Sequence, residues 1–252
     1  NGSSVADCNY RYSQASGAFR SLFPVFTNPA LPFRRRLQIY SQIVMAILLY
    51  GCESQVYTPA QITRFNPLHY KVLRQIFQVK SSFYHRVLQP SDAECSNAFL
   101  LQLAYVHAPR LLIPSQRISV QRLRYLGHIL RHFDSLEHKI SFNTSHSLRT
   151  ISSPFWIGRP RVHWPEIAMS EAYHRYLQLH NGHSPSNQEV HHPLYEIATT
   201  ATVQRYFGPS LIDWQNTTTI WNALLPVASN RYDWDQLVFP GNGRGHSNTA
   251  DV

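Results

Sequence analysis

Apolar residues recur at intervals of three and four along most of the first 133 positions, which is the spacing of helices with one buried face. Pro32 suits the first turn of a helix, and Gly51 suits a helix end. Thr58 followed by Pro59 marks another helix start. Pro67 is expected to kink or divide the segment that contains it. The helices predicted here cover residues 10–23, 32–51, 58–79, 92–106 and 115–133.

The pattern loosens beyond residue 133. Helical spacing resumes near Pro165 and again at 194–207 and 217–225, and no alternating strand pattern of useful length appears. The sequence therefore predicts an all-α protein, with an irregular helical bundle followed by a looser, partly helical C-terminal region. The predicted divisions are a helical region at 1–133, a basic loop or linker at 134–164, a smaller helical region at 165–239 and a disordered tail at 240–252.

Positive charge is concentrated in the front of the chain. Residues 1–164 hold 19 Lys or Arg and 6 Asp or Glu, whereas residues 165–252 hold 4 and 8. Arginine supplies 20 of the 23 cations, and its planar guanidinium fits two phosphate oxygens at once. This distribution favours a polyanionic partner, although a biased genome composition would also enrich arginine.

One predicted helix carries a line of cations. At about 100° per residue, five polar positions of the segment 115–133 fall within an arc of roughly 80°, opposite a broad apolar side. No acidic residue occurs from Ser115 to His132, whereas a merely solvated face normally mixes both signs. We expect this stripe to follow a phosphate backbone, the alternative being an ordinary solvated face. Its members are Arg117, Gln121, Arg124, His128 and Arg131.

Arg122 lies within the apolar arc of the same helix. Burying an unpaired guanidinium is costly, so we expect this side chain to meet a carboxylate, a carbonyl or a ligand. A structural pair with a carboxylate such as Glu53 or Glu94 is one interpretation, and direct contact with a ligand is the other.

Three consecutive arginines, Arg34, Arg35 and Arg36, open the second predicted helix. Cations at this position oppose the helix dipole, so an external anion is a reasonable partner. The alternative is a solvated helix start without a binding role.

A turn fixed by Gly158 and Pro160 presents two further arginines, Arg159 and Arg161. Trp164 follows closely, and its ring either stacks on a base or anchors the loop to the core. We therefore include the two arginines and the tryptophan among the candidate nucleic-acid-binding residues.

Common signatures of catalysis and metal binding are absent from the sequence, which has no GxSxG, P-loop, GxGxxG or HExxH string. Cys8, Cys52 and Cys95 form no CxxC pair, which argues against a zinc knuckle and favours a reduced compartment. No apolar run reaches the ~20 residues of a spanning helix, and the polar start of the chain is not a signal peptide. We expect no metal, no cofactor, no membrane association and an intracellular location, nuclear or cytoplasmic.

Three strings occur in an informative order: Leu48–Glu53 (LLYGCE), Arg122–Arg131 (RLRYLGHILR) and Gly158–Trp164 (GRPRVHW). Together they resemble the LLYGCE, RLxxLGHxxR and GRPxxxW elements of non-LTR (LINE-type) retrotransposon polyproteins, in the region that follows the reverse transcriptase palm. The resemblance covers about residues 10–170. The sequence departs from the family after Glu53, where the frequent tryptophan is missing, and residues 171–252 match no element of it.

The resemblance implies the helical thumb, and the segment beyond it, of a LINE-type reverse transcriptase, which hold template and primer against an upstream palm. Polymerase chemistry needs paired carboxylates for two metal ions, and this sequence has no Asp-Asp pair. Its nearest imitation, Tyr232-Asp233-Trp234-Asp235, has the wrong order and is expected to be a surface turn.

We therefore expect a fragment that is not an enzyme by itself and that binds RNA or DNA through arginine–phosphate contacts, with little base specificity. One alternative is a helical protein-interaction scaffold derived from a decayed retroelement, without nucleic-acid binding. Another is an independent enzyme that uses His and Asp residues.

Overall fold

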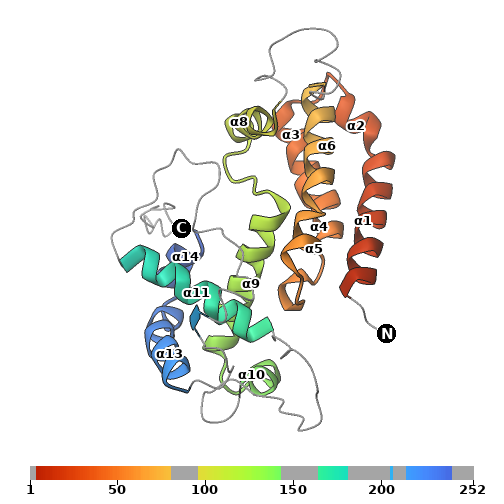
Figure 1. Ribbon diagram of the computed structural model, residues 1–252. Coiled ribbons are helices and arrows are strands. Elements are labelled where there is room, and N and C mark those ends of the chain that lie inside the picture. Colours follow the sequence, from red (N-terminus) through yellow and green to blue (C-terminus); the bar gives the residue numbers. More distant parts are fainter. Residues whose placement is uncertain (1–3, 81–95, 143–163, 181–204, 207–213, 240–252) are drawn as a thin grey trace, which may run out of the picture. The chain divides into compact units, whose positions relative to one another are not determined.

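The computed structural model describes residues 4–80, 96–142, 164–180, 205–206 and 214–239. The secondary-structure elements in these ranges are all helices (Figure 1), so the predicted all-α class is confirmed. The chain divides into two compact units, residues 1–119 and 120–252. The division falls inside helix α9 (Pro114–Arg131), whereas the sequence placed the first boundary after residue 133.

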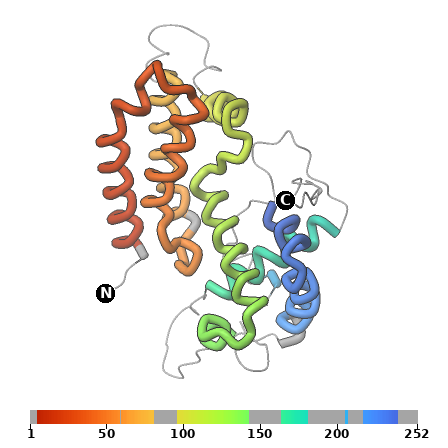
Figure 2. The backbone as a smooth tube through the Cα atoms, turned by 180° about the vertical axis from the view of Figure 1, so that it is seen from behind, coloured from red at the N-terminus to blue at the C-terminus, as the bar shows by residue number. Residues whose placement is uncertain are grey.

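Unit 1 is built from helices that pack side by side, as α1 and the segment from α3 to α4 do in both views (Figures 1 and 2). The first helix begins at Ser4, earlier than predicted, and buries Ala15 and Phe19 on its inner face as expected. The described elements that precede α9 are α1 (Ser4–Ser21), α2 (Phe23–Thr27), α3 (Phe33–Ile39), η1 (Tyr40–Val44), α4 (Met45–Leu48), η2 (Cys52–Ser54), α5 (Pro59–Thr63), α6 (Asn66–Phe77) and α8 (Asn97–His107).

The second predicted helix is a continuous helical segment with a π-helical turn, η1, in its middle. Within η1 the backbone N–H of Met45 donates to the carbonyl of Tyr40, five residues earlier. The segment ends shortly before Gly51, which has a φ of +64° in the left-handed region that favours glycine. The predicted start and end are thus confirmed, and the π turn is a feature that hydrophobic spacing does not reveal.

The third predicted helix is divided into α5 and α6, as proline in its middle required. Thr58 caps α5 through a reciprocal pair of hydrogen bonds with Gln61: the Gln61 N–H donates to Thr58 Oγ1 (3.3 Å), and the Thr58 N–H donates to Gln61 Oε1 (2.7 Å). The predicted apolar side is buried at Ile62, Phe65, Val72, Leu73 and Ile76. Phe77, predicted to be buried with them, is half-buried.

Among its described residues, unit 2 contains most of α9 together with α10 (Leu136–Ser141), α11 (Trp164–His180), α13 (Trp214–Ser229) and α14 (Arg231–Val238). Helix α10 lies in the segment predicted to be a loop, and it starts where Ser135 Oγ accepts the N–H of His138 (3.1 Å). The remaining predicted loop, the predicted helix at 194–207 except residues 205–206, and the predicted tail lie outside the described residues.

The expectation of a surface turn at Tyr232-Asp233-Trp234-Asp235 is wrong. These residues form the first turns of α14, where Asn230 Oδ1 accepts the N–H of Tyr232 (2.9 Å) and caps the helix. Trp234 is 1% exposed and donates from Nε1 to the carbonyl oxygen of Leu123 (2.9 Å). The tryptophan between the two aspartates is therefore a core residue of unit 2.

Candidate nucleic-acid interface

The predicted polar stripe lies on α9, but its members differ in exposure. Arg124 and His128, in the middle of the stripe, are exposed, whereas Arg117 and Arg131 near its ends are half-buried. The side chains available to a ligand on this helix face are therefore chiefly the two central ones.

Both half-buried arginines of the stripe are hydrogen bonded within their own units. Arg117 donates from Nη1 to Oγ (2.8 Å) and to the carbonyl oxygen (3.3 Å) of Ser41. Arg131 donates from Nη1 to the carbonyl oxygen of Ala228 (3.1 Å). Burial, reinforced by the charge of Arg231, lowers the pKa of Arg131 from its ordinary value. These two guanidinium groups contribute to the fold of the protein.

The two exposed members of the stripe have ring neighbours. The guanidinium of Arg124 stands over the ring of Phe239, 4.7 Å from its centroid. The imidazole of His128 lies beside that of His132, with ring centroids 4.5 Å apart. Both side chains remain exposed, so phosphate contacts by either are sterically open.

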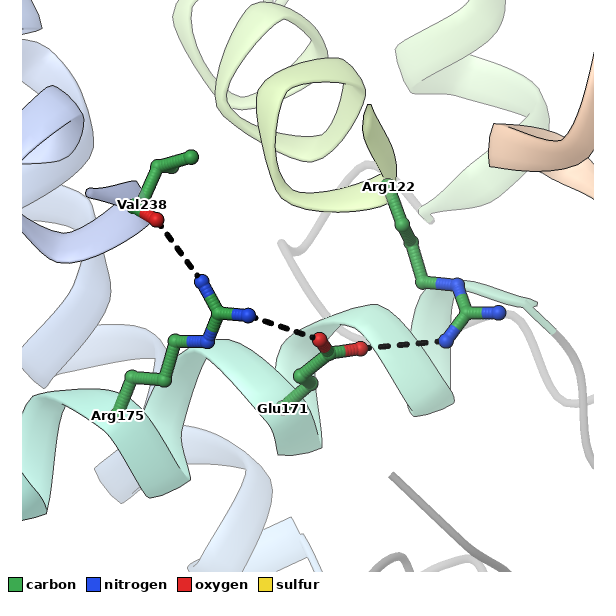
Figure 3. Close-up of polar contacts among 4 residues, drawn as sticks. All are labelled: Arg122, Glu171, Arg175 and Val238. Carbon is green, nitrogen blue, oxygen red and sulfur yellow. Dashed lines mark hydrogen bonds and ion pairs between the residues drawn. The ribbon is translucent and has the colours of Figure 1, made fainter. Parts of the chain in front are cut away.

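Arg122 is fully buried in unit 2 and forms an ion pair with Glu171 on α11 (Figure 3). Its Nη1 lies 3.2 Å from Oε2 of Glu171. Arg175, one turn further along α11, donates from Nη2 to Oε1 of the same carboxylate (3.3 Å) and from Nη1 to the carbonyl oxygen of Val238 (3.2 Å). One buried carboxylate thus joins two buried arginines that come from α9 and α11.

The expected structural pair of Arg122 is therefore present, but its acid is neither of the two considered. Glu53 belongs to unit 1, and Glu94 lies outside the described residues. Glu171 is 49 positions from Arg122, in a helix whose two acidic residues are Glu166 and Glu171. Sequence spacing gives no signal for this pairing, because it depends on how α11 crosses α9.

Trp164 is half-buried at the start of α11, and its ring lies against that of Tyr125 with centroids 5.2 Å apart. Tyr125 belongs to the RLRYLGHILR string, so two of the three strings meet at this contact. The geometry supports the anchoring interpretation of Trp164. Arg159 and Arg161 lie outside the described residues.

The run of three arginines at the start of α3 has two different environments. Arg34 and Arg35 are exposed, and Arg35 donates to the side chain of Gln38 (3.2 Å). Arg36 is buried, and its Nε and Nη1 donate to three carbonyl oxygens, so its assignment to phosphate binding is corrected. The acceptors are Leu31 O (2.8 Å), Phe26 O (3.1 Å) and Ile76 O (2.9 Å).

The described part of unit 1 contains eleven cations and only two acids, Asp7 and Glu53. Asp7 is bonded to Arg11 (2.7 Å) and to the hydroxyl of Tyr57 (2.7 Å), and the hydrogen bond from Arg11 is the main cause that lowers the pKa of this carboxyl. Seven of the eleven cations are exposed and are called here the exposed cation set: Arg20, Arg34, Arg35, Arg64, Lys71, Lys80 and Arg110. Five of these seven were not among the candidate binding residues predicted from the sequence, although the charge count of the front half includes them.

Four members of the exposed cation set lie within three residues, along the chain, of three rings that meet where α3 begins and where α6 and α8 end. The rings of Phe33, Phe77 and His107 meet there, with centroids 5.1 Å apart between Phe33 and each of the other two. Arg34 and Arg35 directly follow Phe33, while Lys80 and Arg110 stand three residues after Phe77 and His107. We call this place the Phe33 end of unit 1. It combines positive charge with a partly exposed aromatic ring.

Other kinds of site are not indicated by the described residues. No group of three or more His, Cys, Asp or Glu side chains in the described ranges is placed to hold a metal ion. No helix in those ranges is long and apolar enough to cross a bilayer. Cys8 and Cys52 are buried, and neither takes part in a disulfide bond.

Comparisons with known proteins add no family: no family model, no curated protein and no solved structure matches the chain.

Proposed function

We propose that this chain binds an RNA or DNA template-primer through arginine–phosphate contacts, as a non-catalytic part of a LINE-type reverse transcriptase that follows the palm. The observation that carries the proposal is the charge of the described part of unit 1, which has seven exposed cations and only two acids, one of them bonded to Arg11. Such a surface attracts a polyanion and gains free energy by releasing its counterions.

The Phe33 end offers the most suitable place for a strand. Its four exposed cations provide phosphate contacts, and phosphate contacts carry no sequence information. Phe33 is 37% exposed, so the ring can also contact an unpaired base, an interaction that tolerates any sequence. This arrangement supports binding with little base specificity.

The family part of the proposal rests on the three sequence strings and on their order. That the chain is not a polymerase by itself is supported by the lack of an Asp-Asp pair in its sequence. The carboxylates would come from the palm of the same polyprotein, which is the proposed neighbour of this chain.

The salt dependence of binding tests the proposal. Fluorescence anisotropy with labelled RNA and DNA oligonucleotides gives the slope of log K against log salt, which reports the number of phosphates neutralised. The double variant Arg34→Gln/Arg35→Gln should weaken binding to every sequence and reduce the slope by about 1.5. Arg231→Gln, an exposed arginine of unit 2, is the matched control and should leave the slope unchanged.

The alternative, a helical scaffold that binds a protein partner, is favoured by one observation. Arg36, Arg117, Arg122 and Arg131, four of the arginines proposed from the sequence, are hydrogen bonded inside the fold. If the wild-type chain shows no salt-dependent affinity for RNA or DNA, the scaffold interpretation replaces the proposal.

A further inference from the structure

Within its described residues, unit 2 holds a buried arginine with two donors that no protein group accepts. The side chain of Arg122 is fully buried, and its one hydrogen bond to this part of the chain runs from Nη1 to Glu171 (Figure 3). Its Nε and Nη2 atoms are buried and have no hydrogen-bond partner among the same residues. Buried charged donors without an acceptor are strongly unfavourable, so an acceptor is missing at this side of the guanidinium.

The nearby carboxylate is already shared. One oxygen of Glu171 accepts from Arg122 and the other accepts from Arg175, so a single negative charge serves two positive ones. Glu166 is the other buried acid of α11, but it stands five positions before Glu171, roughly 140° around the helix, and has contacts of its own. Arg122 therefore keeps an excess of positive charge on the side that faces away from Glu171.

The two unpaired atoms form the side-on edge of the guanidinium. The N–H bonds of Nε and Nη2 point in parallel, and this fork matches two oxygens of one oxyanion. Glu171 binds the opposite part of the group and fixes its orientation. The edge is thus held in position for a bidentate acceptor.

We propose that the Nε–Nη2 edge of Arg122 is a binding site for a phosphate group. A phosphate carries up to two negative charges near neutral pH and offers several strong acceptor oxygens. Its oxygens would accept from Nε and Nη2, and its charge would balance the excess positive charge. The group is either free inorganic phosphate or the terminal phosphate of a nucleic acid. The site shares no residue with the exposed cation set of unit 1. It can therefore be tested separately from the proposed binding of RNA or DNA.

Thermal unfolding of the full chain, followed by tryptophan fluorescence, tests the site. All five tryptophans belong to unit 2, so the signal reports on the unit that contains Arg122. Replacing chloride by inorganic phosphate at constant ionic strength should raise the Tm by about 4 °C at a phosphate concentration ten times Kd. Arg122→Lys keeps the charge but lacks the two-donor edge, and it should lose this response. Arg124→Lys, exposed two positions later, is the control and should keep it.

A second measurement uses the wild-type protein alone and does not depend on whether a variant folds. The Nε–H resonance of Arg122 should shift on addition of phosphate, while that of Arg124 should not. Oligonucleotides with a 5′-phosphate or a 5′-hydroxyl then identify the source. Tighter binding of the phosphorylated one by wild type, lost in Arg122→Lys, assigns a nucleic-acid end; a response to inorganic phosphate alone assigns the free anion. An unchanged Arg122 resonance with both probes, or equal phosphate responses in wild type and Arg122→Lys, would overturn the proposal.

Discussion

The indole of Trp234 lies so close against Gly127 that a methyl group at this glycine would overlap the ring. The same indole donates its N–H to the carbonyl oxygen of Leu123 on α9 (2.9 Å). Glycine in the middle of a helix ordinarily weakens it, so its presence here has a packing reason: it lets α14 approach the α9 backbone. The glycine of the RLRYLGHILR string is therefore explained by contacts within unit 2.

Gly127→Ala should destabilise unit 2 by about 3 kcal/mol, because the added methyl displaces Trp234 and breaks its hydrogen bond. Tryptophan fluorescence during urea unfolding measures the effect, since every tryptophan is in unit 2. Gly17→Ala is the matched control: this α1 glycine has open space around it, and alanine there should stabilise unit 1 by up to about 1 kcal/mol. Equal stabilities of wild type and Gly127→Ala would show that the indole does not pack on this glycine.

Glu171→Gln should be among the most damaging single changes in unit 2. The change removes the buried negative charge that both Arg122 and Arg175 contact, which costs about 3–5 kcal/mol. Asp7→Asn removes one partner of a more exposed ion pair with Arg11 and should cost about 1 kcal/mol or less. Urea unfolding followed by circular dichroism and by fluorescence compares the two. A similar decrease in the free energy of unfolding in both variants would contradict the burial of Glu171 between Arg122 and Arg175.

The sequence predicted the helices of unit 1 well because their signals are local. Proline at a first turn, the Thr58 cap and apolar spacing act within a few residues, and each appears in the structure as expected. The reciprocal bond from Gln61 to this cap was not predicted. Unit 2 was predicted less well, because its short helices α10 and α14 have little apolar periodicity and depend on distant partners. Trp234 is buried by α9, more than a hundred residues earlier.

The candidate site shows the same limit. Charge composition correctly indicated a basic front half, and helical spacing correctly placed five polar residues on one side of α9. Neither signal tells an exposed arginine from one that binds carbonyl groups, since both occupy the same kind of sequence position. Arg35 and Arg36 are neighbours in the chain, yet one is exposed and the other buried.

Lowering the pH should reduce the free energy of unfolding of unit 1 because of His69. This imidazole is fully buried, with Nδ1 2.7 Å from the hydroxyl of Tyr40, and burial lowers its pKa to about 3. The unfolded chain has an ordinary histidine with a pKa of about 6.5, so below that pH it binds one more proton than the folded chain. The contribution of neutral His69 to the free energy of unfolding is therefore fully present above pH ~6.5. It is lost as the pH falls towards ~3, by up to about 1.4 kcal/mol per pH unit.

Hydrogen exchange of the α6 amides between pH 7 and 4, corrected for intrinsic rates, measures this loss. His69→Asn cannot titrate but can still bond to Tyr40, so its stability should depend less steeply on pH than that of wild type. Tyr40→Phe removes the hydrogen bond but leaves the imidazole buried, so it should keep the steep dependence. A wild-type pH dependence as shallow as that of His69→Asn would show that His69 is hydrated in the folded protein.

Substitutions of Arg36 and Arg35 should have different effects, the first on the stability of unit 1 and the second on the binding of RNA or DNA. Arg36→Met leaves three carbonyl oxygens, at the ends of α2 and α6 and before α3, without their donor, which should destabilise unit 1 by about 3 kcal/mol. Arg35→Met removes an exposed charge and should change stability by less than about 0.5 kcal/mol, while it lowers the salt slope of RNA or DNA binding by about 0.8.

The two variants are compared by circular dichroism for stability and by anisotropy for binding, at a temperature where both are folded. Under these conditions Arg36→Met should bind with the wild-type salt slope, because its guanidinium contacts carbonyl oxygens and no phosphate. If instead Arg36→Met is as stable as wild type and its salt slope falls like that of Arg35→Met, the guanidinium of Arg36 is directed to solvent. All three arginines at the start of α3 would then act together on the nucleic-acid backbone.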